Sequence, residues 1–334
     1  MITQLASRYL AELDATMRRV VDDMVTAPDF GVMLRYPLGW VDQNGQPYNH
    51  PTGKRIRPIL LLLATEATGG DFRSALPAAA AVELLHNFSL VHDDIEDDSP
   101  TRHGRATVWT IWGRANAINA GDALFALAYG AMQRLPIPAE VALKVWGIFN
   151  ATNIELTRGQ HMDMRFEKQK TVSVDEYISM IRGKSAALVA ACAQMGALIG
   201  SHDDETAAHF AEFGLNLGLA FQIRDDILGI WGDPAVTGKS AATDILSRKK
   251  SLPVLYGLAQ SAELVELYAR EPFGAAEVDA AVSILNAVDA QTKTLEYETD
   301  FYQQAMAALE RAQPQGAAAV GLKKLTESLF QRAF

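Results

Sequence analysis

Apolar residues recur along this chain with the spacing of helices, every three or four positions, rather than with the alternation of strands. Residues 5–26 combine such apolar positions with charged ones between them, which predicts an amphipathic helix. A second helix is expected to begin near Arg57-Pro58, because proline suits a first helical turn. Further helices are expected at 76–98, 115–133, 138–168, 174–200, 204–231, 250–260, 262–270, 275–311 and 317–332.

Prolines and glycines mark the breaks between these helices. Residues 28–53 hold many of them, so a long loop is predicted there. Shorter turns are expected at 113, 136–138, 200–201 and 314–316. No shift in composition and no short repeat divides the chain, and no run of alternating strands is found. The simplest architecture is therefore one all-α domain, a helical bundle with a central cavity, over residues 1–334.

Composition narrows the class of protein. Apolar residues make up 49% and charged residues 21% of the 334, enough for a sizeable core. A net charge of −10 disfavours nucleic-acid binding, which needs clustered Lys and Arg, but permits an anionic substrate that is bound through metal ions. Cys192 is the single cysteine, so an intramolecular disulfide is excluded. This fits a reducing cytoplasm.

Membrane and export signals are not expected. The N-terminal residues have no apolar signal core. The longest apolar stretch, 186–200, contains Gln194 and is too short and too rich in small residues for a membrane span. A cytoplasmic protein is predicted.

Acidic residues gather at two places. Asp93, Asp94 and Asp97 lie near the expected end of a helix, where the helix dipole disfavours negative charge. Like charges this close are unfavourable unless cations compensate them. Carboxylate oxygens favour Mg²⁺ over Zn²⁺ as that cation. The alternative is an acidic helix end in water.

Asp225 and Asp226 form the second cluster, inside an otherwise apolar helix, with Gln222 one turn earlier. Acids among apolar neighbours rarely lack a partner. Carboxylates on facing helices of a bundle commonly build a metal site. The two clusters together therefore favour a metal site over two solvated acidic patches.

Basic residues accompany both clusters, as a diphosphate ligand would require. Taken singly, each is better explained as a solvated surface charge; their placement beside the acids favours a role in binding. They are Lys54, Arg55, Arg57, Arg102, His103, Arg105, Lys184, Lys239, Arg248, Lys249 and Lys250.

The arrangement of these segments resembles that of the trans-isoprenyl diphosphate synthases. The similarity runs from about 53 to 253 and includes seven motifs in order, at 53–58, 83–109, 120–125, 159–163, 183–188, 221–229 and 238–253. It implies an enzyme that condenses isopentenyl diphosphate with dimethylallyl, geranyl or farnesyl diphosphate. It also implies three Mg²⁺ per site with substrate bound, and a homodimer.

The resemblance assigns roles residue by residue. Asp93, Asp94, Asp97, Asp225 and Asp226 would hold Mg²⁺, with Gln160 and Asp163 nearby. The allylic diphosphate would be bound by Arg102, Lys184, Ser185, Lys239 and Lys249, and isopentenyl diphosphate by Lys54, Arg57, His86 and His103. Gln222 would face the carbocation, and Arg102, Lys184 and Gln222 would be the catalytic side chains. The segment that holds Lys239 is a predicted lid.

Three positions depart from the common pattern. His103 replaces the second arginine of an Arg-Arg pair, and Arg105 is a candidate substitute. Gly229 replaces the third acid of the second motif, and Asp233 is too far along the chain to replace it directly. Ser185 stands where threonine is commoner and keeps a hydroxyl.

Product length is expected to depend on Phe88 and Ser89. Phe88 lies five residues before Asp93, about 7.5 Å along a helix. In the family, an aromatic residue here without an insertion in the first motif goes with geranylgeranyl diphosphate; a core aromatic is the alternative. Farnesyl or longer products, a terpene cyclase and a non-catalytic subunit are the competing functions. Lys54, Arg57 and His86 disfavour the cyclase, and the intact acids disfavour the subunit.

Overall fold

The computed structural model describes residues 2–48, 53–169, 171–232 and 243–330, which are almost entirely helical. The chain divides into two compact units. Unit 1 comprises residues 1–146, 195–203 and 315–321, and unit 2 comprises residues 147–194, 204–314 and 322–334.

Unit 1 contains eight elements and parts of three more. The elements are α1 (Ile2–Met24), α2 (Pro28–Arg35), α3 (Ile56–Ala67), α4 (Phe72–Glu96), β1 (Thr101–Arg102), β2 (Arg105–Ala106), α5 (Val108–Trp112) and α6 (Arg114–Met132). Unit 1 also includes parts of three helices. These are the N-terminal part of α7 (Ala139–Lys168), the C-terminal part of α9 (Ala187–Ser201) and the N-terminal part of α17 (Gly316–Phe330). β1 and β2 form a two-stranded antiparallel hairpin.

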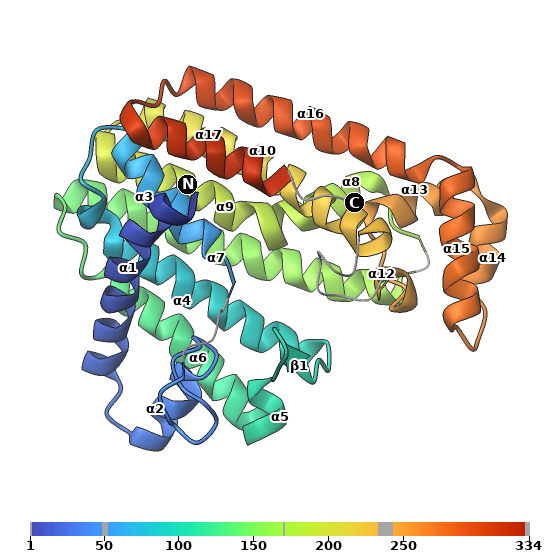
Figure 1. Cartoon of the computed structure of the whole chain (residues 1–334), viewed down its shortest axis with the longest axis horizontal. Coiled ribbons are helices and arrows are strands. Elements are labelled where there is room, and N and C mark those ends of the chain that lie inside the picture. Colours follow the sequence, from blue (N-terminus) through green and yellow to red (C-terminus); the bar gives the residue numbers. More distant parts are fainter. Residues whose placement is uncertain (1, 49–52, 170, 233–242, 331–334) are drawn as a thin grey trace. The chain divides into compact units, whose positions relative to one another are not determined.

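Helix α4 is the centre of unit 1. It packs against α1, α3 and α6, and Figure 1 shows α6 running alongside it. The Asp71 side chain caps its N-terminus by accepting a hydrogen bond from the Arg73 N–H at 3.0 Å. From Phe72 to Leu85 the helix is buried on nearly every side. Its polar C-terminal turn is therefore the part that is left for chemistry.

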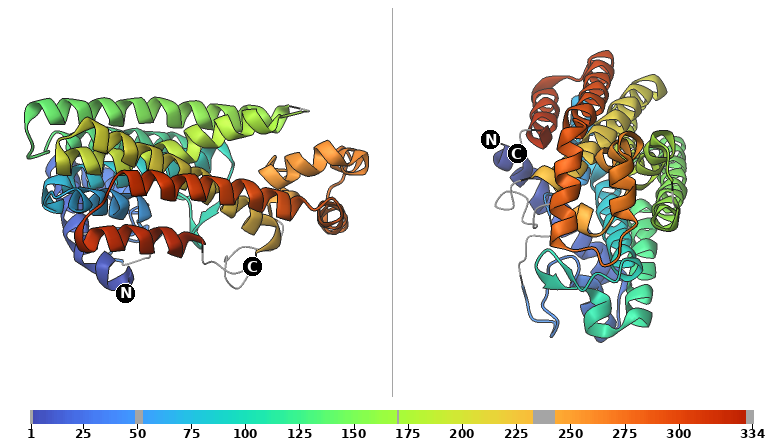
Figure 2. Two further views of the ribbon diagram at one scale, coloured as in Figure 1. Left: turned by 90° about the horizontal axis from the view of Figure 1, so that it is seen from above. Right: turned by 90° about the vertical axis from the view of Figure 1, so that its right-hand side faces the viewer.

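Unit 2 is built around α10 (Asp204–Trp231). Helix α16 (Ala290–Arg311) lies along α10, as Figures 1 and 2 both show. The other elements are α8 (Val174–Ile181), the π-helix η1 (Arg182–Ala186), α12 (Thr243–Leu246), α13 (Leu252–Gln260), α14 (Ala262–Tyr268) and α15 (Ala275–Ala287). Parts of α7, α9 and α17 complete it. A buried cluster that includes Tyr177, Leu219 and Ile223 joins α8, α10 and α13.

Most expected helices are confirmed, but four details are wrong. The loop expected at 28–53 contains α2, because Pro28 begins a helix there rather than breaking one. The helix expected at 275–311 is interrupted at Asp289, whose φ of 58° is left-handed. The helix expected at 174–200 contains the π-helix. The short elements β1, β2, α5 and α12 were not expected, since so few residues show no periodicity.

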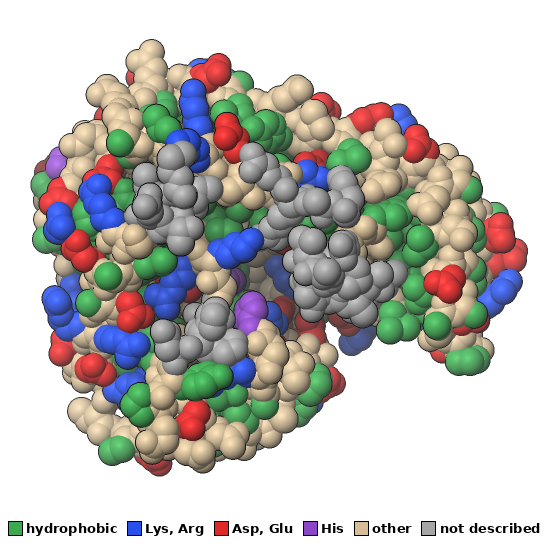
Figure 3. All heavy atoms as spheres, in the orientation of Figure 1, with side chains coloured by type: hydrophobic (Ala, Val, Ile, Leu, Met, Phe, Trp, Pro, Cys, Tyr) green, Lys and Arg blue, Asp and Glu red, His purple; other side chains and the backbone are tan. Residues whose placement is uncertain are grey.

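Two helical stretches have the length and hydropathy of a membrane span, namely Phe72–Glu96 and Val174–Ser201. Most of each is buried inside the structure, 72% and 67% of the apolar window respectively. Core helices of globular proteins behave in this way, so neither is evidence for a membrane protein. In the face shown in Figure 3, acidic and basic side chains are mixed.

Candidate functional site

The first acidic cluster lies at the end of α4, as predicted. The helix ends at Glu96, and Asp97 is its C-terminal cap, with its N–H donating to the Asp93 carbonyl at 2.9 Å. Asp94 is only 5% exposed, whereas Asp97 is open to solvent. The acids therefore collect where helix carbonyls already concentrate negative charge.

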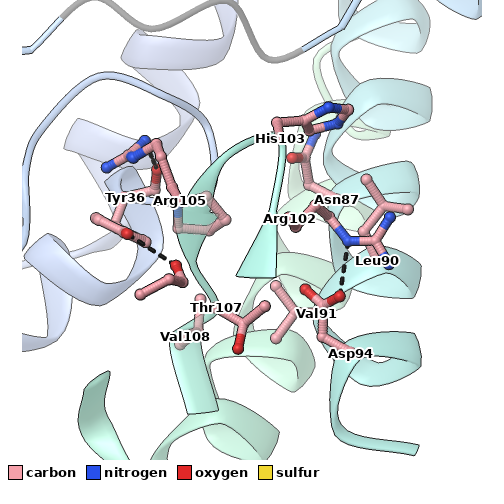
Figure 4. A pocket seen from close by; sticks show the side chains of 12 residues that line it. Tyr36, Asn87, Leu90, Val91, Asp94, Arg102, His103, Arg105, Thr107 and Val108 are labelled. Atoms are coloured by element: carbon pink, nitrogen blue, oxygen red, sulfur yellow. Dashed lines mark hydrogen bonds and ion pairs between the residues drawn. The ribbon is translucent and has the colours of Figure 1, made fainter. Parts of the chain in front are cut away.

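Arg102 is a cation that faces this cluster. It lies in β1, and the hairpin directs its guanidinium at α4 (Figure 4). Its Nε donates to Asp94 Oδ1 at 2.7 Å, and its Nη2 donates to Asp93 Oδ2 at 3.3 Å. Burial raises the pKa of Asp94 to about 6 against the opposing charge of Arg102. The Asp93 charge is a smaller cause, so desolvation rather than repulsion is the main reason for the shift.

A pocket lies beside this cluster, between the hairpin, α4 and the Tyr36-Pro37 segment (Figure 4). From α4 it is lined by Asn87, Leu90, Val91 and Asp94, one face of the helix. The hairpin contributes Arg102, His103 and Arg105. It thus combines an apolar wall with basic side chains, as a site for a small prenyl diphosphate requires.

His103 and Arg105 differ in their surroundings. The Arg105 guanidinium donates to the carbonyls of Tyr36 and Val41 at 3.2 and 3.0 Å, and it stacks on the Tyr36 ring. It is therefore an anchor for the segment after α2. His103 lies at the hairpin turn with a left-handed φ of 51°. Its ring is left at the pocket's edge (Figure 4).

The basic motif before α3 lies near His86 of α4. Arg57 Nη1 is 3.4 Å from His86 Nε2. Arginine only donates, so His86 must accept on Nε2 and carry its proton on Nδ1. Burial, aided by the charges of Arg57 and Arg102, lowers the pKa of His86 well below 6.5. Lys54 is exposed at the entrance to the helix.

Arg55 has a structural role that the sequence did not reveal. It stands before α3 with a left-handed φ of 46°, and its guanidinium lies 3.5 Å from Asp14 of α1 and 4.0 Å from Glu83 of α4. Glu83 is 3% exposed, and burial raises its pKa against the charges of Arg55 and Arg57. Glu83 is an acid in an otherwise apolar helix, one turn before His86. An acid in such a place needs a cationic partner, so it could have indicated from the sequence that Arg55 is a structural residue.

The two acids of the second cluster are not equivalent. Asp226 is 1% exposed. Its Oδ2 accepts hydrogen bonds from the Tyr177 hydroxyl and, at 3.1 Å, from the Leu252 N–H. Its Oδ1 accepts from Gln222 Nε2 at 3.1 Å. Burial raises its pKa to about 6, which Lys249 and the hydrogen bonds oppose. Asp225, next to it, is half-buried.

A hydrogen-bond chain extends from Asp226 to the π-helix. The Ser185 hydroxyl donates to Gln222 Oε1 at 2.6 Å, which fixes the orientation of that amide. Lys184 Nζ donates to Asp163 Oδ2 of α7 at 2.5 Å. A Cβ on Gly159 would collide with the Lys184 backbone. Glycine there lets α7 approach the π-helix closely, and π-helices often mark functional sites.

Two of the remaining predicted residues lie after α10. Lys249 is close enough to Asp226 to lower its pKa. Lys239 and the greater part of the predicted lid lie outside the described residues, as does Asp233. Among the described residues, no group of three Asp, Glu, His or Cys side chains is arranged to hold a metal ion by itself.

Phe88 and Ser89 lie elsewhere on α4. The Phe88 ring is half-buried, against the rings of His92 at 4.7 Å and Phe125 of α6 at 5.0 Å. Phe125 is followed by Tyr129 at 5.2 Å, and Tyr129 by Trp146 at 5.6 Å. Ser89 donates its hydroxyl to the His86 carbonyl at 2.8 Å. Phe88 therefore begins a row of aromatic rings.

Comparison with known proteins gives consistent results. A (2E,6E)-farnesyl diphosphate synthase of Mycobacterium tuberculosis (strain ATCC 25618 / H37Rv) is 45% identical over 73% of this chain and 67% of its own. A geranylgeranyl diphosphate synthase of the same strain is 40% identical over 84% of this chain and 81% of its own. The crystal structure of polyprenyl synthetase from Streptomyces coelicolor A3(2) is 34% identical, covers 98% of this chain and 99% of its own, and has a TM-score of 0.91.

The all-α fold and these relatives define the class of the protein, a trans-prenyltransferase. A family model described as Polyprenyl synthetase matches residues 39–285, and the chain belongs to that family. The predicted fold, family and class of enzyme are thus confirmed.

Proposed function

We propose that the protein condenses isopentenyl diphosphate with an allylic diphosphate, head to tail and in trans, to give mainly geranylgeranyl diphosphate. The observation that carries this proposal is the end of α4, where Asp93 and Asp94 face Arg102 beside a pocket of apolar and basic side chains. Such a site suits a ligand that is part diphosphate and part hydrocarbon.

The donor groups of both clusters fit Mg²⁺. They are carboxylates, the hard oxygen ligands that Mg²⁺ prefers, and they are few enough to leave positions for water and phosphate oxygens. Asp93, Asp94 and Asp97 would hold it in unit 1, and Asp225 and Asp226 in unit 2, with Gln160 and Asp163 nearby. When bound, Mg²⁺ neutralises the charge that develops on a leaving diphosphate. The number of ions, three per site with substrate, is part of the proposal.

Basic side chains divide between the two substrates. Arg102, Lys184 and Lys249 are proposed to bind the allylic diphosphate, since each lies beside an acid of the clusters or of the Gln160–Asp163 pair. Lys239 is proposed for the same ligand. Arg102 and Lys184 would stabilise the departing diphosphate without reorganisation, because neighbouring carboxylates already hold them. Gln222 is proposed to face the allylic cation, its amide fixed by the Ser185 hydroxyl.

Isopentenyl diphosphate is proposed to bind Lys54, Arg57, His86 and His103. Arg57 lies within 3.4 Å of His86, and Glu83 and Asp14 hold the adjacent Arg55 in place. A neutral His86 donates from Nδ1 and adds no charge. His103 replaces an arginine of similar enzymes, so His103→Arg should tighten isopentenyl diphosphate binding, measured as a lower KM for that substrate alone.

The proposal is tested by product analysis. The protein is incubated with Mg²⁺, isopentenyl diphosphate and dimethylallyl, geranyl or farnesyl diphosphate in turn, and the products are identified by mass spectrometry. Geranylgeranyl diphosphate should predominate with every primer. A main product of fifteen carbons would identify a farnesyl diphosphate synthase instead, the activity of the 45% identical relative from Mycobacterium tuberculosis. A cyclic hydrocarbon made without isopentenyl diphosphate would instead identify a terpene cyclase.

A cytoplasmic homodimer is proposed. Large apolar side chains are exposed on unit 1, among them Ile118 at 44% and Leu143 at 74%, which a second copy could cover. Sedimentation equilibrium of the purified protein checks the oligomeric state, and a monomer at micromolar concentration would contradict it. An inactive protein that gains activity only with a partner synthase would identify a non-catalytic subunit.

A further inference from the structure

Three basic residues follow one another in the segment between α12 and α13, namely Arg248, Lys249 and Lys250. Their position in the sequence makes each of them a candidate for binding a diphosphate. The Leu252 N–H donates to Asp226 Oδ2 at 3.1 Å, so this segment passes directly beside the second acidic cluster. The side chains of the three residues nevertheless have different surroundings in the structure.

Arg248 is held by the connection between α14 and α15. Its guanidinium donates to the Arg270 carbonyl, pairs with the Glu271 carboxylate at 2.8 Å and lies over the Phe273 ring at 4.7 Å. The Glu271 side chain is 76% exposed, so the ion pair contributes less than the carbonyl bond and the stacking do. Arg248 has a left-handed φ of 54°, which costs free energy in most residues other than glycine, and these contacts offset that cost. Its side chain is therefore an anchor.

Lys250 is held by the C-terminal end of α7. Its ammonium donates to the carbonyls of Phe166 and Gln169. The last carbonyls of a helix have no partner within the helix, and the helix dipole favours a cation beside them. Burial lowers the pKa of Lys250, which agrees with an ammonium that lies against protein. Two of its three N–H groups are therefore already used by the backbone.

Lys249 lies between these two anchors. Its own N–H donates to the Asp244 carbonyl at 2.9 Å, and the Arg248 N–H donates to the Ile245 carbonyl at 2.9 Å, so the backbone turns at the end of α12. Burial raises the pKa of Asp226 and the charge of Lys249 opposes that rise, which agrees with a position near the second cluster. A flexible lysine serves a ligand best when the backbone that carries it is fixed.

We propose that Arg248 and Lys250 are positioning residues rather than substrate-binding cations, and that their anchored side chains hold the backbone of Lys249 beside the second acidic cluster. This inference rests on the proposed function, in which Lys249 binds the allylic diphosphate. The middle residue of the three then has one role and its two neighbours have another. Loss of either anchor weakens the contact that Lys249 makes, although neither anchor touches the ligand.

A double-mutant cycle on ligand binding tests the inference. Binding of inorganic diphosphate to the full chain is measured by calorimetry with and without Mg²⁺, and the Mg²⁺-dependent site is followed. Lys249→Met should weaken this site about 10-fold or more, since one charge-assisted contact is lost. Lys250→Met keeps the length of the side chain, and Arg248→Gly keeps the left-handed backbone. Each should weaken the site by a smaller factor, about 3–10-fold.

Combination with Lys249→Met separates positioning from direct binding. In that background each anchor change should weaken the site by less than about twofold more, because an anchor that acts only through Lys249 has nothing left to position. A residue that itself binds the ligand would instead give additive losses. In steady-state kinetics, the anchor variants should raise the KM of the allylic substrate and leave the KM of isopentenyl diphosphate unchanged.

The control is Lys293→Met, which removes a lysine of α16 that pairs with Glu296 and should leave the affinity unchanged. Circular dichroism establishes that each variant is folded, and Arg248→Gly decides alone if Lys250→Met does not fold. Wild-type affinity in a folded anchor variant, or additive losses in the double variants, would overturn the inference. If wild type forms prenyl products and either result is found, only the inference fails. If wild type forms no prenyl product, the proposed function fails and the inference fails with it.

Discussion

Removing the Phe88 ring should lengthen the product, and the structure indicates by how much. The ring of Phe125 on α6 lies 5.0 Å from that of Phe88, and on the proposed floor role it is the next ring that a longer product would meet. One isoprene unit adds four carbons to the main chain of the product and extends it by about 5 Å. Phe88→Ala should therefore admit about one further isoprene unit before Phe125 stops the chain. The double variant Phe88→Ala/Phe125→Ala should admit about two.

The effect on stability separates a pocket floor from a core residue. Phe72 begins the same helix and is 0% exposed, so Phe72→Ala should lower the free energy of unfolding by about 3–5 kcal/mol. Phe88 is only half-buried, so Phe88→Ala should lower the free energy of unfolding by clearly less than Phe72→Ala does. Phe72→Ala should leave product length unchanged, which makes it the matched control on α4.

The assay extends farnesyl diphosphate with excess labelled isopentenyl diphosphate and resolves the dephosphorylated products by chain length. Urea unfolding is measured on the same preparations. Folded Phe88→Ala with the wild-type product distribution would refute the floor role. A loss of stability equal to that of Phe72→Ala, with unchanged products, would identify Phe88 as an ordinary core aromatic.

Three further predictions concern the acids, the cations and the buried histidine. Asp93→Ala or Asp225→Ala should lower condensation about 10²–10³-fold with the fold intact, and turnover within a few-fold of wild type would contradict the metal assignment. Lys54→Ala and Arg57→Ala should raise the KM of isopentenyl diphosphate more than that of the allylic substrate, each by the equivalent of about 1.5–3 kcal/mol; equal rises would argue against a separate second site. The folded-state pKa of His86 lies below its usual 6.5, so the unfolded chain takes up this proton first as pH falls. The contribution of His86 to the free energy of unfolding should therefore be complete above pH 6.5. Below that pH it should decline, by up to about 1.4 kcal/mol per pH unit. Urea unfolding of wild type and His86→Gln between pH 5 and 8 measures this pH dependence, which the variant should lack.

The long helices and both acidic clusters could be predicted from sequence because they depend on local patterns. Apolar spacing fixes a helix such as α10, and Asp93 and Asp97 share a helical turn whatever surrounds them. The fine distinctions could not be predicted, because they depend on contacts between distant residues. Asp225 and Asp226 are adjacent in sequence, yet only Asp226 meets Tyr177 and Leu252.

The same limit explains the other differences from expectation. Arg55 and Arg57 belong to one basic motif, but only the structure shows that Asp14 and Glu83 hold Arg55. The π-helix at Lys184 likewise lies against α7 at Gly159, a contact that no periodicity reveals.

The burial of Asp226 affects how relatives of this protein should be interpreted. Its buried carboxylate joins α8, α10 and α13 through Tyr177, Gln222 and Leu252, so it contributes to the packing of unit 2 as well as to the site. A descendant that lost catalysis would still be under pressure to keep this aspartate. Asp226 alone is therefore a poor marker of a working enzyme.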